Sequence, residues 1–183
     1  MKSEVIKFLK QYQMTSSDID ISSTLKKFTV EMNKGLEKTG PISECSIPMI
    51  ATYLNPCVTI KKGERVIVID AGGTNLRVGL ASFDGGDWIL SDVREDKMPG
   101  LSREYSKEEF FDYIALRTKP FLDKARNIGF CFSYRVAMNK DLDGRLIAWA
   151  KEIKAKEVVD SLVLKTFNEI LSLMPYGCVV SLS

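Results

Sequence analysis

Six consecutive residues in the first half of the chain have the side chains and backbone freedom of an anion-binding turn. They read Asp70-Ala71-Gly72-Gly73-Thr74-Asn75 and stand between an apolar run and an alternating apolar segment. Two consecutive glycines let the backbone approach an anion without a Cβ in the way and orient successive N–H groups toward it. Thr74 and Asn75 add side-chain donors, and Arg77 can add a charge-assisted one. The pattern predicts a turn that holds phosphate.

Asp70 extends this hypothesis to a metal ion. Magnesium is typically bound by one or two carboxylates together with phosphate oxygens and water, so Asp70 could hold Mg2+ through its water shell. The alternative is a plain hairpin in which Gly72-Gly73 only makes the turn, and the glycine pair by itself favours that reading. Other phosphate motifs are absent, because the sequence contains neither GxGxxG after a strand nor GxxxxGK[ST].

The composition excludes several other kinds of chemistry. The chain has no histidine, and its four cysteines form no CxxC pair: Cys45, Cys57, Cys131 and Cys178. Ordinary zinc sites and histidine-based nucleophile triads are therefore excluded. The 26 basic and 24 acidic residues are mixed along the chain and give a net charge of +2, so there is no basic stripe for nucleic acid.

The same features indicate where the protein works. No uncharged run at the N-terminus forms a signal peptide, and no apolar stretch approaches membrane-spanning length. We therefore expect a soluble, cytoplasmic protein with reduced thiols, which binds neither nucleic acid nor membrane.

The phosphate turn is expected to connect two strands of an α/β domain. Val66 to Ile69 is a short apolar run typical of a strand buried on both faces, and Leu76 to Ala81 alternates as a second strand. We predict an antiparallel hairpin with Gly72-Gly73 at its tip. Residues 88–90, which follow Gly85-Gly86, predict a third antiparallel strand.

Helices and further strands complete this domain. Ser106 to Glu109 is a capping box, and the helix that follows takes its apolar content from Phe110, Phe111, Ile114, Leu116 and Phe121. Residues 128–132 and 178–182 predict two more buried strands. A second helix is expected over much of residues 158–174, before Pro175.

Two helices are predicted ahead of the α/β domain. Residues 5–9 can present one apolar face, and Thr15 to Asp18 supplies N-cap chemistry for the second helix. That helix ends near Gly40-Pro41 and carries an apolar stripe of Leu25, Phe28, Met32 and Leu36. We therefore assign residues 1–60 to an N-terminal helical and connecting segment, and residues 61–183 to the α/β domain.

Four segments, in the right order, resemble the hexokinase family. Val68 to Val78 looks like the first phosphate motif of these sugar kinases, and Ile47 to Tyr53 is similar to the segment that leads into their small domain. Ile128 to Tyr134 resembles the sugar-binding signature, which Asp143 to Lys151 continues at the right spacing. The resemblance implies the actin-like (ribonuclease-H-like) small domain of a eukaryotic-type hexokinase or glucokinase, with a mixed sheet. In an intact hexokinase the preceding helices pack on a large domain.

The resemblance implies ATP-dependent phosphorylation of a hexose, glucose above all, at its primary hydroxyl, which is the first step of glycolysis. ATP and Mg2+ would be the cofactors. The positions that match the phosphate and magnesium side are Asp70, Gly72, Gly73, Thr74, Asn75 and Arg77, and those that match sugar contacts are Ser133 and Lys151. Without the motif, Ser133 would be read as a strand-end turn and Lys151 as a solvated lysine.

The sequence departs from the family pattern at two positions. Arg135 stands where family members usually have proline, and Ala150 stands where they have threonine, so the loop beside the sugar and one hydroxyl contact should differ. In the family, a strand resembling Cys178 to Ser183 leads into an Asn-Asp pair whose aspartate is the general base. We therefore expect no catalytic base and no large domain within this sequence, and an inactive chain.

Two other function classes stay open. A non-catalytic sugar-binding or regulatory hexokinase-like protein would account for Arg135 and Ala150. An actin-like or chaperone-type ATPase could use the turn at residues 70–75, but the matches at residues 132–134 and 149–151 argue against it.

Overall fold

The structure, a computed structural model, describes residues 2–37, 46–47, 49, 59, 61–149, 152–174 and 181–182. The chain divides into two compact units, residues 1–51 and residues 52–183. Among the helices of the described ranges, none combines the length and the hydropathy that crossing a bilayer requires.

The first unit is helical. It contains α1 (Lys2–Gln11), the short 3-10 helix η1 (Ser16–Asp18) and α2 (Ile21–Glu37). The predicted N-cap of the second helix is wrong, because Thr15 and Asp18 form a capping box on η1 instead. At the start of α2 the Asp20 carboxylate accepts the Ser23 N–H at 3.1 Å. The predicted helix end at residues 40–41 lies outside the described residues. All four residues of the predicted apolar stripe are exposed: Leu25, Phe28, Met32 and Leu36.

The second unit is built on a mixed five-stranded sheet of order β3-β2-β1-β4-β7. The strands are β1 (Arg65–Ala71), β2 (Asn75–Phe83), β3 (Trp88–Lys97), β4 (Asn127–Phe132) and β7 (Ser181–Leu182). The predicted antiparallel hairpin is confirmed, since β1 pairs with β2 in the register Val66↔Ala81 to Ala71↔Leu76. β3 adds antiparallel to β2, as predicted, but is longer than expected. β4 runs parallel to β1 and to β7.

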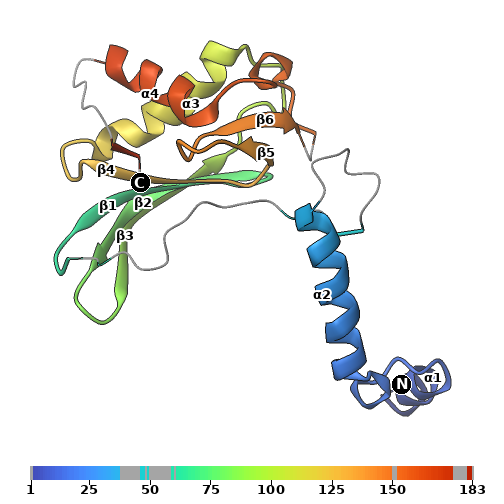
Figure 1. The fold of residues 1–183 in the computed structure, drawn as a ribbon. Helices are drawn as coiled ribbons and strands as arrows, with labels where there is room; N and C mark the ends of the chain where they lie inside the picture. Colours follow the sequence, from blue (N-terminus) through green and yellow to red (C-terminus); the bar gives the residue numbers. More distant parts are fainter. Residues whose placement is uncertain are drawn as a thin grey trace. The chain divides into compact units, whose positions relative to one another are not determined.

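Both longer helices of this unit, α3 (Lys107–Thr118) and α4 (Val163–Leu173), lie on the same side of the sheet (Figure 1). The predicted capping box of α3 is confirmed, because the Ser106 hydroxyl accepts the Glu109 N–H at 3.2 Å and the Glu109 carboxylate accepts the Ser106 N–H at 3.0 Å. α3 buries Phe110, Phe111 and Ile114, whereas Leu116 is exposed. The 3-10 helix η3 (Lys119–Phe121) buries Phe121, and η4 (Lys156–Val158) takes the residues where α4 was expected to begin.

Among the described residues, one face of the sheet is covered by helices and the other is largely open. Ile67, Ile69 and Ala71 are buried under the helices, while Val66 and Val68 on the opposite face are only half-buried. The predicted burial of β1 on both faces is therefore wrong for the described residues, because α3 and α4 cover a single face. On the other face, Gly79 and Gly129 help to line an apolar hollow of about 550 Å³.

A small hairpin, which the sequence pattern did not reveal, completes the second unit. It consists of β5 (Arg135–Met138) and β6 (Gly144–Ala148), paired antiparallel. The loop between them is held by the Asn139 side chain, whose oxygen accepts the N–H groups of Asp141 and Asp143, each at 3.0 Å. The strands are too short to give a clear alternation, and a register shift between Arg135 and Val136 interrupts it further.

Candidate phosphate and sugar site

Backbone hydrogen bonds to the carbonyl groups of Ala71, Thr74 and Asn75 fix the turn between β1 and β2. The Gly72 N–H closes the turn by donating to the Asn75 carbonyl at 3.0 Å. The Ala71 carbonyl accepts the Ser133 N–H at 3.1 Å, and the Thr74 carbonyl accepts the Met98 N–H at 2.9 Å. No hydrogen bond between described residues uses the N–H groups of Gly73 or Thr74. The turn thus offers two successive amide donors on a fixed backbone, which is the arrangement that binds anions.

A second glycine pair in the same sheet shows how a purely structural turn differs. Gly85-Gly86 lies in the turn between β2 and β3, where the Asp84 carboxylate accepts the N–H groups of Gly86 and Asp87, both at 2.9 Å. These two backbone hydrogen bonds lower the pKa of Asp84. This turn therefore carries its own anion, a carboxylate, whereas the turn at Gly72-Gly73 carries none among the described residues. The difference favours an external anion at the first turn.

The side chains around the turn of residues 70–75 form a network of two ion pairs and two hydrogen bonds to the Asn75 amide. The Arg77 guanidinium donates to Glu95 at 2.7 Å and to Asp70 at 3.2 Å. The hydrogen bond and charge of Glu95, with a smaller contribution from Asp70, raise the pKa of Arg77. The Asn75 amide donates to Glu95 at 3.0 Å and accepts from the Lys97 ammonium at 3.2 Å. The network contains two cations, Arg77 and Lys97, and two carboxylates, Asp70 and Glu95, so its net charge is zero. Attraction for a phosphate would therefore come from the backbone amides of the turn and from a cation that rotates away from its carboxylate.

The residues of the sugar signature lie directly beside this turn. In the parallel pairing of β1 and β4, Asp70 is opposite Cys131 and Ala71 is opposite Phe132. Ser133 is exposed, and its hydroxyl lies 3.9 Å from the Cys131 thiol. Its backbone is held by the Ala71 carbonyl, as described above. The chain therefore brings the predicted phosphate residues and one predicted sugar residue together at the ends of adjacent strands.

Lys151 and Ala150, the other positions of interest for the sugar, lie outside the described residues. The chain is anchored on both sides of them. The Trp149 indole donates to the Ala155 carbonyl at 2.8 Å. The Lys154 N–H donates to the Gly100 carbonyl at 2.8 Å, and a Cβ on Gly100 would come within 2.9 Å of Ile153. Arg135 is exposed at the start of β5, opposite Ala148.

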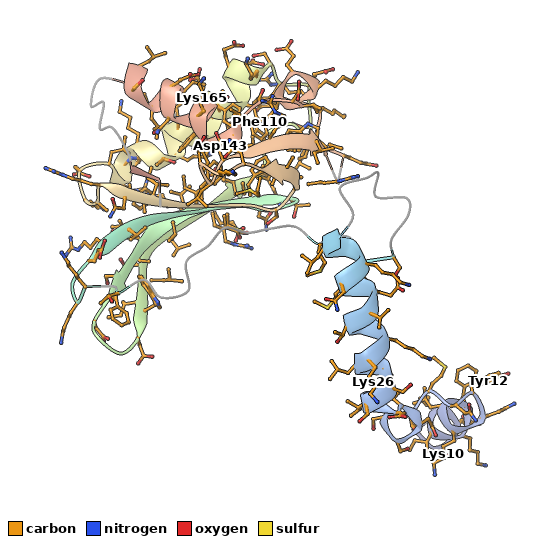
Figure 2. All side chains as sticks on the ribbon, in the orientation of Figure 1. Lys10, Tyr12, Lys26, Phe110, Asp143 and Lys165 are labelled. Carbon is orange, nitrogen blue, oxygen red and sulfur yellow. The ribbon has the colours of Figure 1, made fainter. Side chains whose placement is uncertain are left out.

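Asp143, which belongs to the sugar signature, has a structural partner that the sequence did not suggest. Its buried carboxylate accepts the N–H groups of Leu164 at 2.9 Å and Lys165 at 3.0 Å, in the first turn of α4. Leu162, the residue at the N-cap position of that helix, provides no side-chain cap. Figure 2 shows Asp143 next to α4, close to Lys165. Asp143 thus joins the β5–β6 hairpin to α4 and replaces the missing local cap.

Three features of the site were missed by sequence reasoning. Glu95 and Lys97 lie at the end of β3, where the register places Glu95 opposite Arg77 and Lys97 opposite Asn75. Extending the predicted third strand from Trp88 in an unbroken register would have placed Arg94 opposite Arg77 and Asp96 opposite Asn75, because the register shifts by one residue between Val78 and Leu80. The cap made by Asp143 joins residues that are 21 and 22 positions apart, and no local pattern signals it.

Asp70 is the carboxylate that the sequence predicted to hold a metal ion at the turn. Its side chain is 43% exposed and carries one ion pair, to Arg77. No group of three or more histidine, cysteine, aspartate or glutamate side chains lies close enough to hold a metal within the described ranges. A Mg2+ ion bound mainly by phosphate oxygens and water needs only one such carboxylate, so the residues present fit this mode of binding.

Several known proteins with sequences similar to this chain are hexokinases. A family model described as hexokinase matches residues 4–176. Hexokinase-2 of Candida albicans is 32% identical over 165 residues, which cover 83% of this chain and 33% of the relative. Hexokinase-1 of Saccharomyces cerevisiae is 33% identical over 140 residues, which cover 72% of this chain and 28% of the relative. The chain thus spans about a third of the length of these relatives.

The fold comparison points the same way. A hexokinase from Schistosoma mansoni, solved in complex with glucose, aligns over 99% of this chain and 41% of its own with a TM-score of 0.68 and 24% sequence identity. The predicted fold class, an α/β actin-like domain with a mixed sheet and preceding helices, is confirmed by this likeness and by the strand order.

Proposed function

Because this chain belongs to the hexokinase family, we propose that it takes part in ATP-dependent phosphorylation of a hexose at its primary hydroxyl. Its second unit would provide one wall of the active site, with the phosphates of ATP at the turn of residues 70–75 and the sugar at Ser133 and Lys151. Glucose is the proposed hexose, as in the complex of the Schistosoma relative. The observation that carries the proposal is the pair of amides at Gly73 and Thr74, which no hydrogen bond between described residues uses, in the turn whose Ala71 carbonyl accepts the Ser133 N–H.

The division of work follows from the chemistry of phosphoryl transfer. Such reactions depend mainly on positioning and on neutralising charge that develops on the phosphoryl oxygens. Gly72 and Gly73 would bring the backbone close to the phosphates, Thr74 and Asn75 would add side-chain donors, and Arg77 would turn from Glu95 toward the ligand. Asp70 would hold Mg2+ through the water bound to the ion, and Mg2+ would supply positive charge that neutralises the phosphate oxygens.

The remaining assignments complete this proposal. Residues 61–183 would form the small domain, and residues 1–60 the N-terminal segment that packs on a large domain. The cytoplasm is the proposed location, and the one described cysteine, Cys131, is exposed with a free thiol. A non-catalytic sugar-binding or regulatory role is the second candidate, and the exposed Arg135 two residues after Ser133 is the observation that favours it.

Titration of the 183-residue chain with magnesium tripolyphosphate tests the phosphate assignment. We expect the backbone amide resonances of Gly73 and Thr74 to shift. Those of Gly86 and Asp87 should not shift, because these N–H groups already donate to the Asp84 carboxylate. Gly72→Ala should weaken binding about fivefold, since its Cβ would lie 3.0 Å from the Asn75 oxygen and disturb one hydrogen bond of the turn.

Gly86→Ala is the matched control, because its Cβ would meet no atom closer than 3.8 Å. Binding that leaves the Gly73 and Thr74 resonances unchanged would refute the phosphate assignment. A parallel titration with glucose, expected to shift Ser133, separates the two candidate functions. Glucose binding without any binding of phosphate at the turn would favour the regulatory role.

A further inference from the structure

One hydrogen bond joins the phosphate turn to the sugar segment through a side chain. The Tyr134 hydroxyl donates to the Gly72 carbonyl at 2.6 Å, although the two residues are 62 positions apart. Tyr134 follows Ser133, the proposed sugar contact, and Gly72 precedes Gly73, whose amide is proposed to bind phosphate. The bond therefore links two backbone segments at points one residue away from each proposed ligand contact.

The ring of Tyr134 is held so that its hydroxyl has little freedom. It is 7% exposed. It packs edge-on against Trp149, with ring centroids 4.7 Å apart and planes at 88°, and lies 4.9 Å from the Phe132 ring. Trp149 is fixed in turn by its indole hydrogen bond to Ala155. A displacement of the Gly72 carbonyl must therefore move this aromatic cluster or break the hydrogen bond.

The hydroxyl stays a donor throughout the neutral range. Burial raises the pKa of Tyr134 to about 12, so it does not ionise where a kinase would work. No other hydrogen bond to the Gly72 carbonyl occurs among the described residues. Tyr134→Phe would keep the ring packing and remove the hydrogen-bond donor to the Gly72 carbonyl, so its cost would be confined to the turn.

We propose that Tyr134 is a positioning residue that couples the phosphate turn to the sugar-facing segment, so that an anion bound at the turn stiffens the backbone of Ser133 and a bound sugar does the same for the turn. This inference rests on the proposed function for the identity of the two ligands. Coupling between sites is reciprocal, and one neutral hydrogen bond limits it to about fivefold in either affinity.

The first test needs no ligand. In the 183-residue chain, Tyr134→Phe should speed hydrogen exchange at the amides of Gly72 and Ser133 about fivefold, because both donate to carbonyls in or beside the linked segments. Tyr113→Phe is the matched control, since that hydroxyl also donates to a backbone carbonyl, at Lys97 and 3.0 Å. It should leave the two rates unchanged. Equal rates at these amides in the parent and Tyr134→Phe would overturn the positioning role.

The second test measures the coupling. The chain has two tryptophans, so a Trp88→Phe background makes Trp149 the only one. Addition of magnesium tripolyphosphate should change the Trp149 fluorescence, and in Tyr134→Phe this response should vanish while calorimetry still detects binding, about fivefold weaker. An undiminished fluorescence response in Tyr134→Phe would overturn the coupling. If magnesium tripolyphosphate does not bind to the parent chain, the phosphate assignment and the coupling are both refuted. The hydrogen-exchange rates at Gly72 and Ser133 would still test whether the Tyr134 hydrogen bond stabilises the two segments.

Discussion

Asp143 offers the sharpest test of how the second unit is held together, because the residue is 7% exposed and its carboxylate accepts two N–H groups of α4. Asp143→Ala removes both acceptors from a helix whose N-cap residue, Leu162, cannot replace them. Losing an N-cap costs about 0.5–2 kcal/mol, and a hydrogen bond to a charged group is worth about 1.5–3 kcal/mol. These figures describe overlapping interactions, so we expect the free energy of unfolding to fall by about 2 kcal/mol.

Thermal unfolding followed by tryptophan fluorescence measures this loss, since Trp88 and Trp149 both belong to the second unit. For a chain of this size, about 2 kcal/mol corresponds to a fall in Tm of about 4–8 °C. Asp143→Asn retains one acceptor oxygen and should lose less. The control is Asp141→Ala in the same loop, where the side chain is exposed and the expected change is within about 0.5 kcal/mol.

A rescue variant ties the loss to capping. Leu162 has an extended backbone, with φ −76° and ψ 112°, which suits an N-cap residue. Leu162→Asp in the Asp143→Ala background should therefore recover about 1 kcal/mol. If Asp143→Ala unfolds at the same temperature as the parent, or if the local cap recovers nothing, the capping role is wrong.

Three further outcomes are expected. Gly100→Ala should lower the free energy of unfolding by about 2 kcal/mol, because φ is +88° and the new Cβ would lie 2.9 Å from Ile153. Urea titration measures this loss, and a loss no greater than that of Gly86→Ala would contradict it. Because the native state holds the Tyr134 proton to a pKa of about 12 and an unfolded tyrosine to about 10, the stabilisation from this group is complete below pH 10 and is lost as the pH rises toward 12. The parent should therefore lose stability relative to Tyr134→Phe across that window in alkaline urea titrations, and parallel pH profiles would argue against it. Finally, the resemblance implies a general base in an Asn-Asp pair, and these 183 residues contain no such pair. A coupled assay of the 183-residue chain with glucose, Mg2+ and ATP should therefore show no turnover, and robust turnover would require a different base.

Local sequence patterns were sufficient for the features whose causes are local. Apolar runs on either side of Gly72-Gly73 predicted the hairpin, and the residue types of Ser106 and Glu109 predicted the capping box of α3. Both features depend on residues only a few positions apart. Local reasoning failed to place the N-cap of α2, because two nearby positions both carry residue types that can cap a helix. Thr15 to Asp18 caps η1, and Asp20 serves α2, although either position carries suitable residue types.

The likeness to the hexokinases could be read from the order of residues, since the turn at 70–75 and the signature near Ser133 are contiguous motifs. The same motifs supplied the candidate site residues, whose roles stay predictions. What only the tertiary structure decided is how those motifs are joined and which of their groups are free. The pairing of β2 with β3 commits Arg77 to Glu95, and the parallel pairing of β1 with β4 brings Ser133 to the phosphate turn. Backbone hydrogen bonds consume some amides and leave others, so the contrast between the occupied amides at Gly86 and the unused ones at Gly73 exists only once the chain has folded.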